Sequence, residues 1–291
     1  MHYTKVRTIL SAKNGMNLYR GCLHGCIYCD SRSNCYNIQH KFEDVEIKEN
    51  AIELLEKALK CKRKKCMIGM GSMTDPYIPL ETDIKNTRKA LELIYKYGFG
   101  ATLITKSANI LRDLDILKEI NEKTKCVIQM TLTTFDEKLC KIVEPNVGTT
   151  KERFETLKVL NENNIPTVVW LTPILPFIND TKENITGILD YCIKAKVYGI
   201  ICFGMGVTLR EGNREYFYEK LDKFFPAIKE KYIKTYGINY ILNSPNNNYL
   251  MNIFYKTCKQ HNIICNNNGI FKYLNTFESK EITEKQQLEL F

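Results

Sequence analysis

Apolar and polar positions along the chain alternate between two kinds of segment. Short and almost continuously apolar runs predict buried strands, while longer segments with an apolar residue every three or four positions predict amphipathic helices. The strands are expected at 16–19, 66–71, 101–105, 126–132, 166–171 and 199–203. The helices are expected at 51–60, 85–97, 110–121, 149–160 and 180–196, caps included. The chain therefore reads as about six β/α units.

Two of these helices begin with a capping signal. Thr149 and Glu152 have the T-x-x-E spacing of a capping box, and Asp180 and Glu183 have the corresponding D-x-x-E spacing. We therefore expect Thr149 and Asp180 to be N-caps.

Apolar strands joined by helices predict a parallel sheet that helices cover on its outer face. We expect an α/β fold of the partial (β/α)6 TIM-barrel type, with a complete barrel and a doubly wound sheet as the alternatives. Residues 215–291 look mainly helical, which predicts a core barrel at 1–214 and a C-terminal helical extension packed on it. In such folds the carboxyl ends of the strands form the active face, and polar residues collect there along this chain.

Composition narrows the class of protein. The 291 residues contain no apolar run of about 18 residues, so we expect a cytoplasmic protein without a membrane span. We also expect a monomer. Most of the 12 cysteines stand singly in apolar segments, as buried thiols do in a reducing compartment. The net charge of +9 is compatible with a polyanionic partner, although a Lys- and Asn-rich composition gives the same value.

Three cysteines stand apart from the others in a short glycine-bearing loop. Cys22, Cys26 and Cys29 are separated by three and then two residues. A structural zinc site usually takes four ligands in two pairs, and this chain has no second C-x-x-C. Three thiolates instead suit a [4Fe-4S] cluster with one open iron. A non-catalytic iron-sulfur or zinc protein for electron transfer or binding stays the alternative.

The motif C-x-x-x-C-x-aromatic-C, with Tyr28 before the last cysteine, resembles the signature of the radical S-adenosylmethionine (SAM) superfamily. The resemblance implies that SAM binds the open iron, that a reductant such as flavodoxin or ferredoxin drives its cleavage, and that the resulting 5′-deoxyadenosyl radical abstracts hydrogen from a substrate. The chain is most similar to the branch related to spore photoproduct lyase, over about residues 14–206. The stretches that carry this similarity are NLYRGCLHGCIYCDSR, GSMTDPYIPLE, ATLITKS, MTLTT, IVEP followed by Arg153, and GIICFGMG.

The same resemblance implies a set of SAM contacts. Tyr28 would pack beside the cluster and adenine, Lys106 would pair with the SAM carboxylate, and Thr131, with Thr133 on the same side, would contact the methionine part. The candidates for the SAM amino group are Ser72, Thr74 and Asp75, of which Asp75 is the best partner for an ammonium. Gly204, in the Gly-Met-Gly run, would let the backbone approach adenine. Each has a structural alternative: a core anchor for Tyr28, an Asp-Pro turn for Asp75, and ordinary strand residues for the threonines.

One position departs from the branch. Photoproduct lyases carry a hydrogen-donating cysteine three residues before the aspartate of the second motif, and here that position is Ser72. Because a serine O–H bond is too strong for this role, we do not expect thymine-dimer repair by the same cycle. The substrate stays open between nucleic acid, as in a DNA-repair lyase, and a peptide or small molecule. No catalytic residue is assigned, Cys35 lies outside the cluster spacing, and His24 is expected to make local hydrogen bonds.

Overall fold

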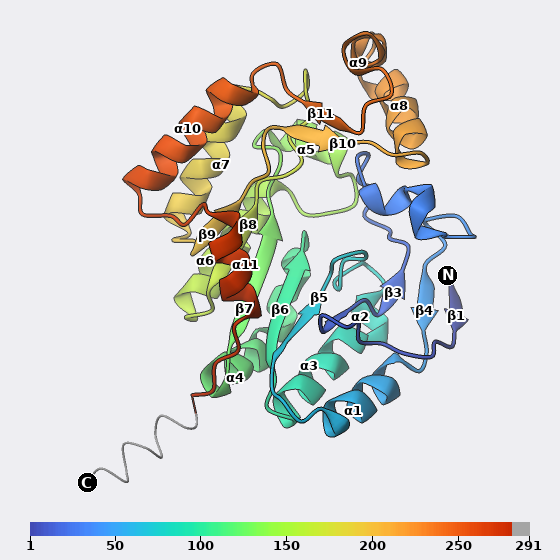
Figure 1. Ribbon diagram of the computed structural model, residues 1–291, viewed down its shortest axis with the longest axis vertical. Coiled ribbons are helices and arrows are strands. Elements are labelled where there is room, and N and C mark those ends of the chain that lie inside the picture. Colours follow the sequence, from blue (N-terminus) through green and yellow to red (C-terminus); the bar gives the residue numbers. More distant parts are fainter. Residues whose placement is uncertain (281–291) are drawn as a thin grey trace.

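Six parallel strands form the central sheet of the molecule (Figure 1). The computed structural model describes residues 1–280, and in this part of the chain the strand order follows the sequence. The strands are β2 (Gly15–Met16), β5 (Met67–Met70), β6 (Gly100–Thr105), β7 (Cys126–Thr131), β8 (Thr167–Trp170) and β9 (Gly199–Ile201). Within the described residues β2 and β9 do not pair, so the barrel is open. The predicted partial (β/α)6 barrel is confirmed, and the doubly wound alternative is wrong.

Helices occupy the connections between the strands and cover the outer face of the sheet. They are α1 (Ala51–Cys61), α2 (Glu81–Ile84), α3 (Asn86–Lys96), α4 (Leu114–Lys123), α5 (Glu137–Val143), α6 (Thr150–Glu162) and α7 (Lys182–Lys194). A 3-10 turn, η3 (Ala108–Asp113), opens the predicted helix 110–121. Along β7, Cys126, Ile128 and Met130 belong to the large core shared with these helices, as the alternation of a strand requires.

The inner face of the sheet is filled from below by a helix of the C-terminal segment. Ile270 and Leu274 of α11 (Asn267–Asn275) pack against inward residues of the strands, among them Val127 and Val168. Above this layer, Gln129 accepts a hydrogen bond from Trp170 and donates one to Thr102. The barrel is therefore packed at its lower end, and the cavity described below lies toward the carboxyl ends of the strands.

A second small sheet lies beside the barrel at the N-terminus. It consists of β1 (His2–Thr4), β4 (Glu46–Lys48) and β3 (Tyr19–Arg20), in that order. The predicted strand 16–19 is thus divided between two sheets. The division falls at Asn17, whose side-chain oxygen accepts hydrogen bonds from the backbone N–H groups of Met73 and Thr74 instead of continuing the strand.

The C-terminal segment is mainly helical, as predicted, with one strand that the pattern did not indicate. It contains α8 (Asn213–Phe224), α9 (Ile228–Tyr236), α10 (Asn247–Gln260) and α11, and β11 (Ile241–Asn243) pairs antiparallel with β10 (Gly206–Thr208). Phe217 and Tyr232 share a core cluster with Tyr28, so this segment supports the cysteine loop. Residues 281–291 of the predicted extension lie outside the described residues, and the division at residue 214 stays a prediction.

The two capping predictions had different outcomes. Thr149 and Glu152 form the predicted capping box at the start of α6. The prediction for Asp180 is wrong, because Thr181 caps α7 by accepting the N–H of Asn184. The Asp180 carboxylate instead accepts the hydroxyl hydrogen of Ser244. None of the helices among residues 1–280 has the length and apolar character needed to cross a membrane.

Candidate active site

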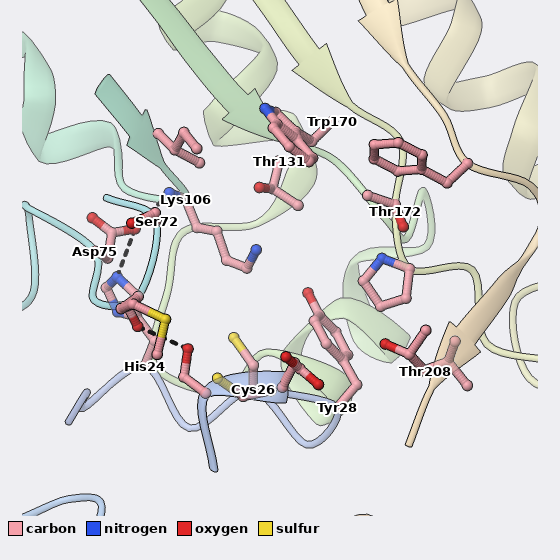
Figure 2. A pocket seen from close by; sticks show the side chains of 18 of the residues that line it. His24, Cys26, Tyr28, Ser72, Asp75, Lys106, Thr131, Trp170, Thr172 and Thr208 are labelled. Atoms are coloured by element: carbon pink, nitrogen blue, oxygen red, sulfur yellow. Dashed lines mark hydrogen bonds and ion pairs between the residues drawn. The ribbon is translucent and has the colours of Figure 1, made fainter. Parts of the chain in front are cut away.

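A cavity of about 520 Å³ opens at the carboxyl ends of the barrel strands (Figure 2). Residues at or just after the carboxyl ends of β5, β6, β7, β8 and β9 all contribute to its wall, and the cysteine loop after β3 also lines it. The lining residues used below are Cys22, Cys26, Tyr28, Cys29, Ser72, Asp75, Lys106, Thr131, Trp170, Phe203, Gly204, Gly206, Thr208, Ile241 and Asn243. The polar residues predicted at the carboxyl ends of the strands therefore surround a cavity.

The cysteine loop is held by backbone contacts at several points. The N–H of Cys22 donates to the carbonyl of Phe42 (3.0 Å), and that of Ile27 donates to the carbonyl of Val143 (3.0 Å). Gly21 has φ +84°, and a Cβ there would lie 2.4 Å from the Phe42 carbonyl oxygen. Only glycine fits this close approach. Within the described chain, the cavity wall takes its thiols from Cys22, Cys26 and Cys29 alone.

All three of these thiols lie in surroundings that disfavour the bare thiolate. Burial, with a smaller effect of Cys29, raises the pKa of the Cys22 thiol to about 12. Burial likewise raises the pKa of Cys26 far above its ordinary value, with Glu144 adding to the effect. For Cys29 burial again raises the pKa, while nearby Arg32 and Lys106 act in the opposite direction. Thiolates at this site thus need a cation to stabilise them.

A buried charge network lies directly behind the loop. Glu144 and Arg153 are both fully buried, and the guanidinium donates to the carboxylate at 2.5 Å. The Tyr28 hydroxyl donates to the other oxygen of Glu144. Burial alone would raise the pKa of Glu144, but Arg153 and Lys106 outweigh it and hold that pKa below its usual range. Glu144 therefore stays a carboxylate and fixes the ring of Tyr28.

Lys106 extends from the end of β6 into the cavity toward the cysteine loop (Figure 2). Its Nζ lies 3.9 Å from a Glu144 oxygen and 5.7 Å from the centre of the Tyr28 ring. These are long contacts, so its three N–H donors are available to a ligand in the cavity. Its predicted role opposite the SAM carboxylate stays a prediction.

Asp75 lines the cavity, but the protein already uses both of its carboxylate oxygens. One oxygen accepts from Tyr77 N and the Thr105 hydroxyl, and the other accepts from Lys106 N, all within 2.8 Å. His24 Nε2 lies 3.1 Å from the second oxygen (Figure 2). Burial would raise the pKa of Asp75, yet His24 and the backbone donors keep it low. We therefore treat Asp75 as a positioning residue that ties the cysteine loop to β6.

The other candidates of the second motif point in different directions. Ser72 lines the cavity and its hydroxyl accepts from Asn17 at 3.2 Å. Thr74 does not line the cavity, because its buried hydroxyl donates to the carbonyl of Gly21. Gly71, with φ +98°, starts the turn where a Cβ would meet the Ile104 carbonyl at 2.1 Å. Ser72 is thus placed for a ligand, and Thr74 supports the loop.

Thr131 and Gly204 both reach the cavity, and Thr133 does not. The strand ends at Thr131, so the alternation that would have put Thr133 on the same side is lost. Thr133 is fully buried, and its carbonyl accepts from Asn179 and Asn184. Gly204 and Gly206 line the cavity while Met205 between them is buried in the core.

One wall of the cavity was not predicted from the sequence. It is formed by Trp170, Phe203, Thr208, Ile241 and Asn243, from β8 onward (Figure 2 labels Trp170 and Thr208). Their position at the carboxyl end of a predicted strand could have indicated Trp170 and Phe203. Ile241 and Asn243 reach the cavity only because β11 pairs with β10, and no local signal marks that pairing.

Cys35 lies outside the cavity lining. Its exposed sulfur accepts a hydrogen bond from Arg210 at 3.4 Å. This placement agrees with its exclusion from the cluster set.

The sequence profile of the radical SAM superfamily matches residues 16–192. The chain belongs to the radical SAM superfamily. An uncharacterized protein of Methanocaldococcus jannaschii is 35% identical over 176 residues, which are 60% of this chain. The aligned part spans 65% of that relative's length, slightly less than two thirds.

Solved structures share the fold of this radical SAM chain. A mutant of spore photoproduct lyase superposes with a TM-score of 0.63 over 89% of this chain and 78% of the lyase, at 13% identity. A second mutant, with bound AdoMet and dinucleoside spore photoproduct, gives a TM-score of 0.60 over 84% of this chain and 73% of the lyase, also at 13% identity. The chain is therefore a radical SAM protein with the fold of spore photoproduct lyase.

Proposed function

We propose that this protein is a radical SAM enzyme in which Cys22, Cys26 and Cys29 hold a [4Fe-4S] cluster and the cavity above them binds SAM. The observation that carries the proposal is that the buried thiols of Cys22 and Cys26 and the half-buried thiol of Cys29 open into one cavity that also receives the Lys106 side chain. When bound, such a cluster with SAM on its open iron supplies an electron that splits SAM and yields a 5′-deoxyadenosyl radical able to take hydrogen from a substrate.

The residues present fit this group. Three thiols match the protein ligands of a cluster that keeps one iron open. Arg32 and Lys106 act on Cys29 as positive charges, which favours an anionic cluster. Among residues 1–280, only His2, His40 and Asp44 bring three ligand atoms within 4.8 Å of one another. The three cysteine sulfurs do not form such a compact group, and three protein thiolates are the ligand set of a cluster with one open iron, which supports a cluster over the zinc alternative.

The chain's own groups would position SAM from two sides. The Lys106 ammonium would pair with the SAM carboxylate, and the Ser72 hydroxyl, which accepts from Asn17, lies in the same cavity. Glu144 holds Tyr28 beside the cysteines, so its ring forms a fixed wall for the adenosyl part. The backbone at Gly204 and Gly206 would approach adenine closely. Asp75 would orient the loop and Lys106 rather than contact SAM.

The substrate would lie on the side of Trp170 and Phe203, where the cavity wall is aromatic and partly exposed. Its class stays open between nucleic acid and a peptide or small molecule. The enzyme would also need an external one-electron donor such as flavodoxin or ferredoxin. In the described chain the cavity is lined by no thiol other than the three cysteines, which supports a way of ending the reaction different from thiol hydrogen donation.

Anaerobic reconstitution with iron and sulfide tests the proposal. We expect a brown protein with about four irons per chain that converts SAM to 5′-deoxyadenosine when reduced. Cys26→Ala should lose both the colour and the SAM cleavage, whereas the matched control Cys35→Ala should keep both. A colourless zinc-loaded protein, or SAM cleavage that survives in Cys26→Ala, would overturn the assignment.

A further inference from the structure

A second group of metal-ligand side chains lies on the small N-terminal sheet, outside the cavity. His2 is on β1, and His40 and Asp44 are on the segment that leads into β4. One nitrogen or oxygen atom from each lies within 4.8 Å of the other two. The parallel pairing of β1 with β4 places His2 opposite Glu46, so residues distant in sequence meet here.

The ring of His40 is arranged as a metal-bound imidazole usually is. Its Nδ1 lies 2.9 Å from the carbonyl oxygen of Lys41 and can only be the donor of that bond. In the neutral ring this leaves the lone pair on Nε2. This Nε2 atom is buried and has no hydrogen-bond partner, with Glu46 Oε2 at 3.6 Å as an ionisable neighbour. A backbone carbonyl that orients one ring nitrogen while the other binds a metal is a recurrent pattern.

The side chains of His2 and Asp44 can approach an ion bound to Nε2 of His40. His2 Nδ1 lies 3.1 Å from Asp44 Oδ2, and the rings of His2 and His40 meet edge to face at 4.8 Å between centres. Both His2 and Asp44 are about 41% exposed, so small rotations meet little resistance. The second Asp44 oxygen contacts the Met1 amine at 2.6 Å, which is the competing interaction.

We propose that His2, His40 and Asp44 bind one divalent transition-metal ion, best matched by Zn²⁺, with the Glu46 carboxylate in reach as a fourth ligand. Two imidazoles and carboxylate oxygens suit zinc, whereas magnesium and calcium prefer oxygen ligands alone. Zinc-ligand bonds of about 2.0–2.2 Å require ligand atoms roughly 3.4 Å apart. The present spacing therefore needs inward movements of about 1 Å.

The ion would act structurally on the segment that supports the cysteine loop. Phe42 lies between the two ligands His40 and Asp44, and its carbonyl accepts the N–H of Cys22. The same carbonyl is in close contact with Gly21. An ion that joins β1 to residues 40–44 would thus stiffen the start of the loop without entering the cavity. This inference stands on geometry outside the cavity and does not depend on the proposed function.

Zinc analysis of the 291-residue chain, before and after anaerobic treatment with iron and sulfide, tests the site whether or not a cluster forms. After equilibration with a slight excess of Zn²⁺ and gel filtration, we expect one zinc per chain. Its X-ray absorption at the zinc edge should show nitrogen and oxygen ligands without sulfur, which separates this site from zinc on a cysteine. His40→Gln and Asp44→Asn should lose the zinc. His261→Gln, which changes an exposed histidine at the end of α10, should keep it.

Thermal unfolding provides the second readout. Zinc should raise the unfolding midpoint of the wild type and of His261→Gln by several degrees, because an ion that binds only the folded state stabilises it. It should leave Asp44→Asn unchanged. Circular dichroism checks that each variant is folded. If His40→Gln does not fold, Asp44→Asn, whose side chain is half-exposed, tests the site alone. A sulfur-ligated zinc, no bound zinc, or equal zinc binding in a folded ligand variant would overturn the proposal.

Discussion

The two walls of the cavity are built in opposite ways. The wall formed by the cysteine loop and the ends of β5 to β7 is buried and charged, and Asp75 on it and Glu144 behind it are each held by several partners. The opposite wall, from β8 onward, is largely apolar, with Phe203 62% and Ile241 59% exposed. Charges held in fixed positions suit a cofactor, which has the same charged groups in every reaction. Exposed apolar side chains can change their conformation to fit a substrate. We therefore assign the first wall, together with the backbone at Gly204 and Gly206, to the proposed cofactors, and the exposed aromatic side chains of the second wall to the substrate.

The charged wall should be the more sensitive of the two, because its buried groups depend on one another. Removal of one member of a buried ion pair leaves an uncompensated charge in the protein interior. Removal of an exposed apolar side chain leaves only a small change in buried area. The variants below are ordered by the size of the effect that this contrast predicts.

Arg153→Leu should have the largest effect. Glu144 would keep its buried charge without the guanidinium at 2.5 Å, and the carbonyls of Thr131 and Gly148 would lose a donor. We expect a loss of about 3–5 kcal/mol in the free energy of unfolding, measured by chemical denaturation.

The double variant Glu144→Gln with Arg153→Leu should recover part of this loss, because no buried charge is left unpaired. Lys158→Met, which removes an exposed partner of Glu155 on the same helix, should leave the denaturation midpoint almost unchanged. If Arg153→Leu were as stable as Lys158→Met, the charged wall would not depend on this pair.

Asp75→Asn should come next, with a loss of about 2–3 kcal/mol at neutral pH, because a carboxylate that accepts several hydrogen bonds is replaced by an amide. The pKa of Asp75 is lowered in the folded protein, with burial opposing and His24 and backbone donors favouring the carboxylate. Its stabilising effect is therefore complete above the unfolded pKa of about 3.9 and is lost as the pH falls through the lower folded pKa.

Denaturation curves at several pH values check this second variant. The stability difference between wild type and Asp75→Asn should be constant from pH 7 to about pH 5 and shrink below about pH 4. A difference that grew on acidification would mean that Asp75 is protonated in the folded protein at neutral pH.

Lys106→Met should affect the ligand more than the fold. Glu144 keeps Arg153 as its partner, so iron content and stability should change little. The proposed SAM carboxylate would lose its ammonium, and we expect about 10- to 100-fold weaker SAM binding, the usual effect of one charged hydrogen bond. Equilibrium dialysis of SAM with the reconstituted protein measures it, with Lys65→Met as a control away from the cavity. Unchanged SAM affinity would remove Lys106 from the proposed site.

The charged wall is also the part of the site that sequence could predict best. Strand ends are marked by the hydrophobic period and by turn residues, and the cysteine spacing is local. The predicted residues of this wall that line the cavity are Cys22, Cys26, Cys29, Ser72, Lys106 and Thr131, and Gly204 lines it from the opposite wall. Thr74 and Asp75 show the limit of such reasoning. Sequence gives the residue type and its strand, but the direction of the Thr74 hydroxyl and the partners of Asp75 depend on tertiary contacts.

The opposite wall and the lower barrel could not be predicted for a related reason. β11 is only three residues long and pairs with β10 across two helices, so no periodic pattern precedes it. The segment that forms α11 looked like part of an extension, whereas Ile270 and Leu274 fill the inside of the barrel. Both are pairings between residues far apart in sequence, whose energy comes from burial and not from local preference.

Phe203→Ala should have the smallest effect and completes the contrast. The ring is mostly exposed and its nearest aromatic neighbours, Trp170 and Phe271, are about 6 Å away between ring centres. We expect a change below about 0.5 kcal/mol in the free energy of unfolding, and SAM binding and substrate-free SAM cleavage within twofold of the wild type. Phe99→Ala, at a fully buried ring, should cost about 3–5 kcal/mol and serves as the matched control. If Phe203→Ala weakened SAM binding as strongly as Lys106→Met, the two walls would share one ligand, and the division between a cofactor side and a substrate side would be wrong.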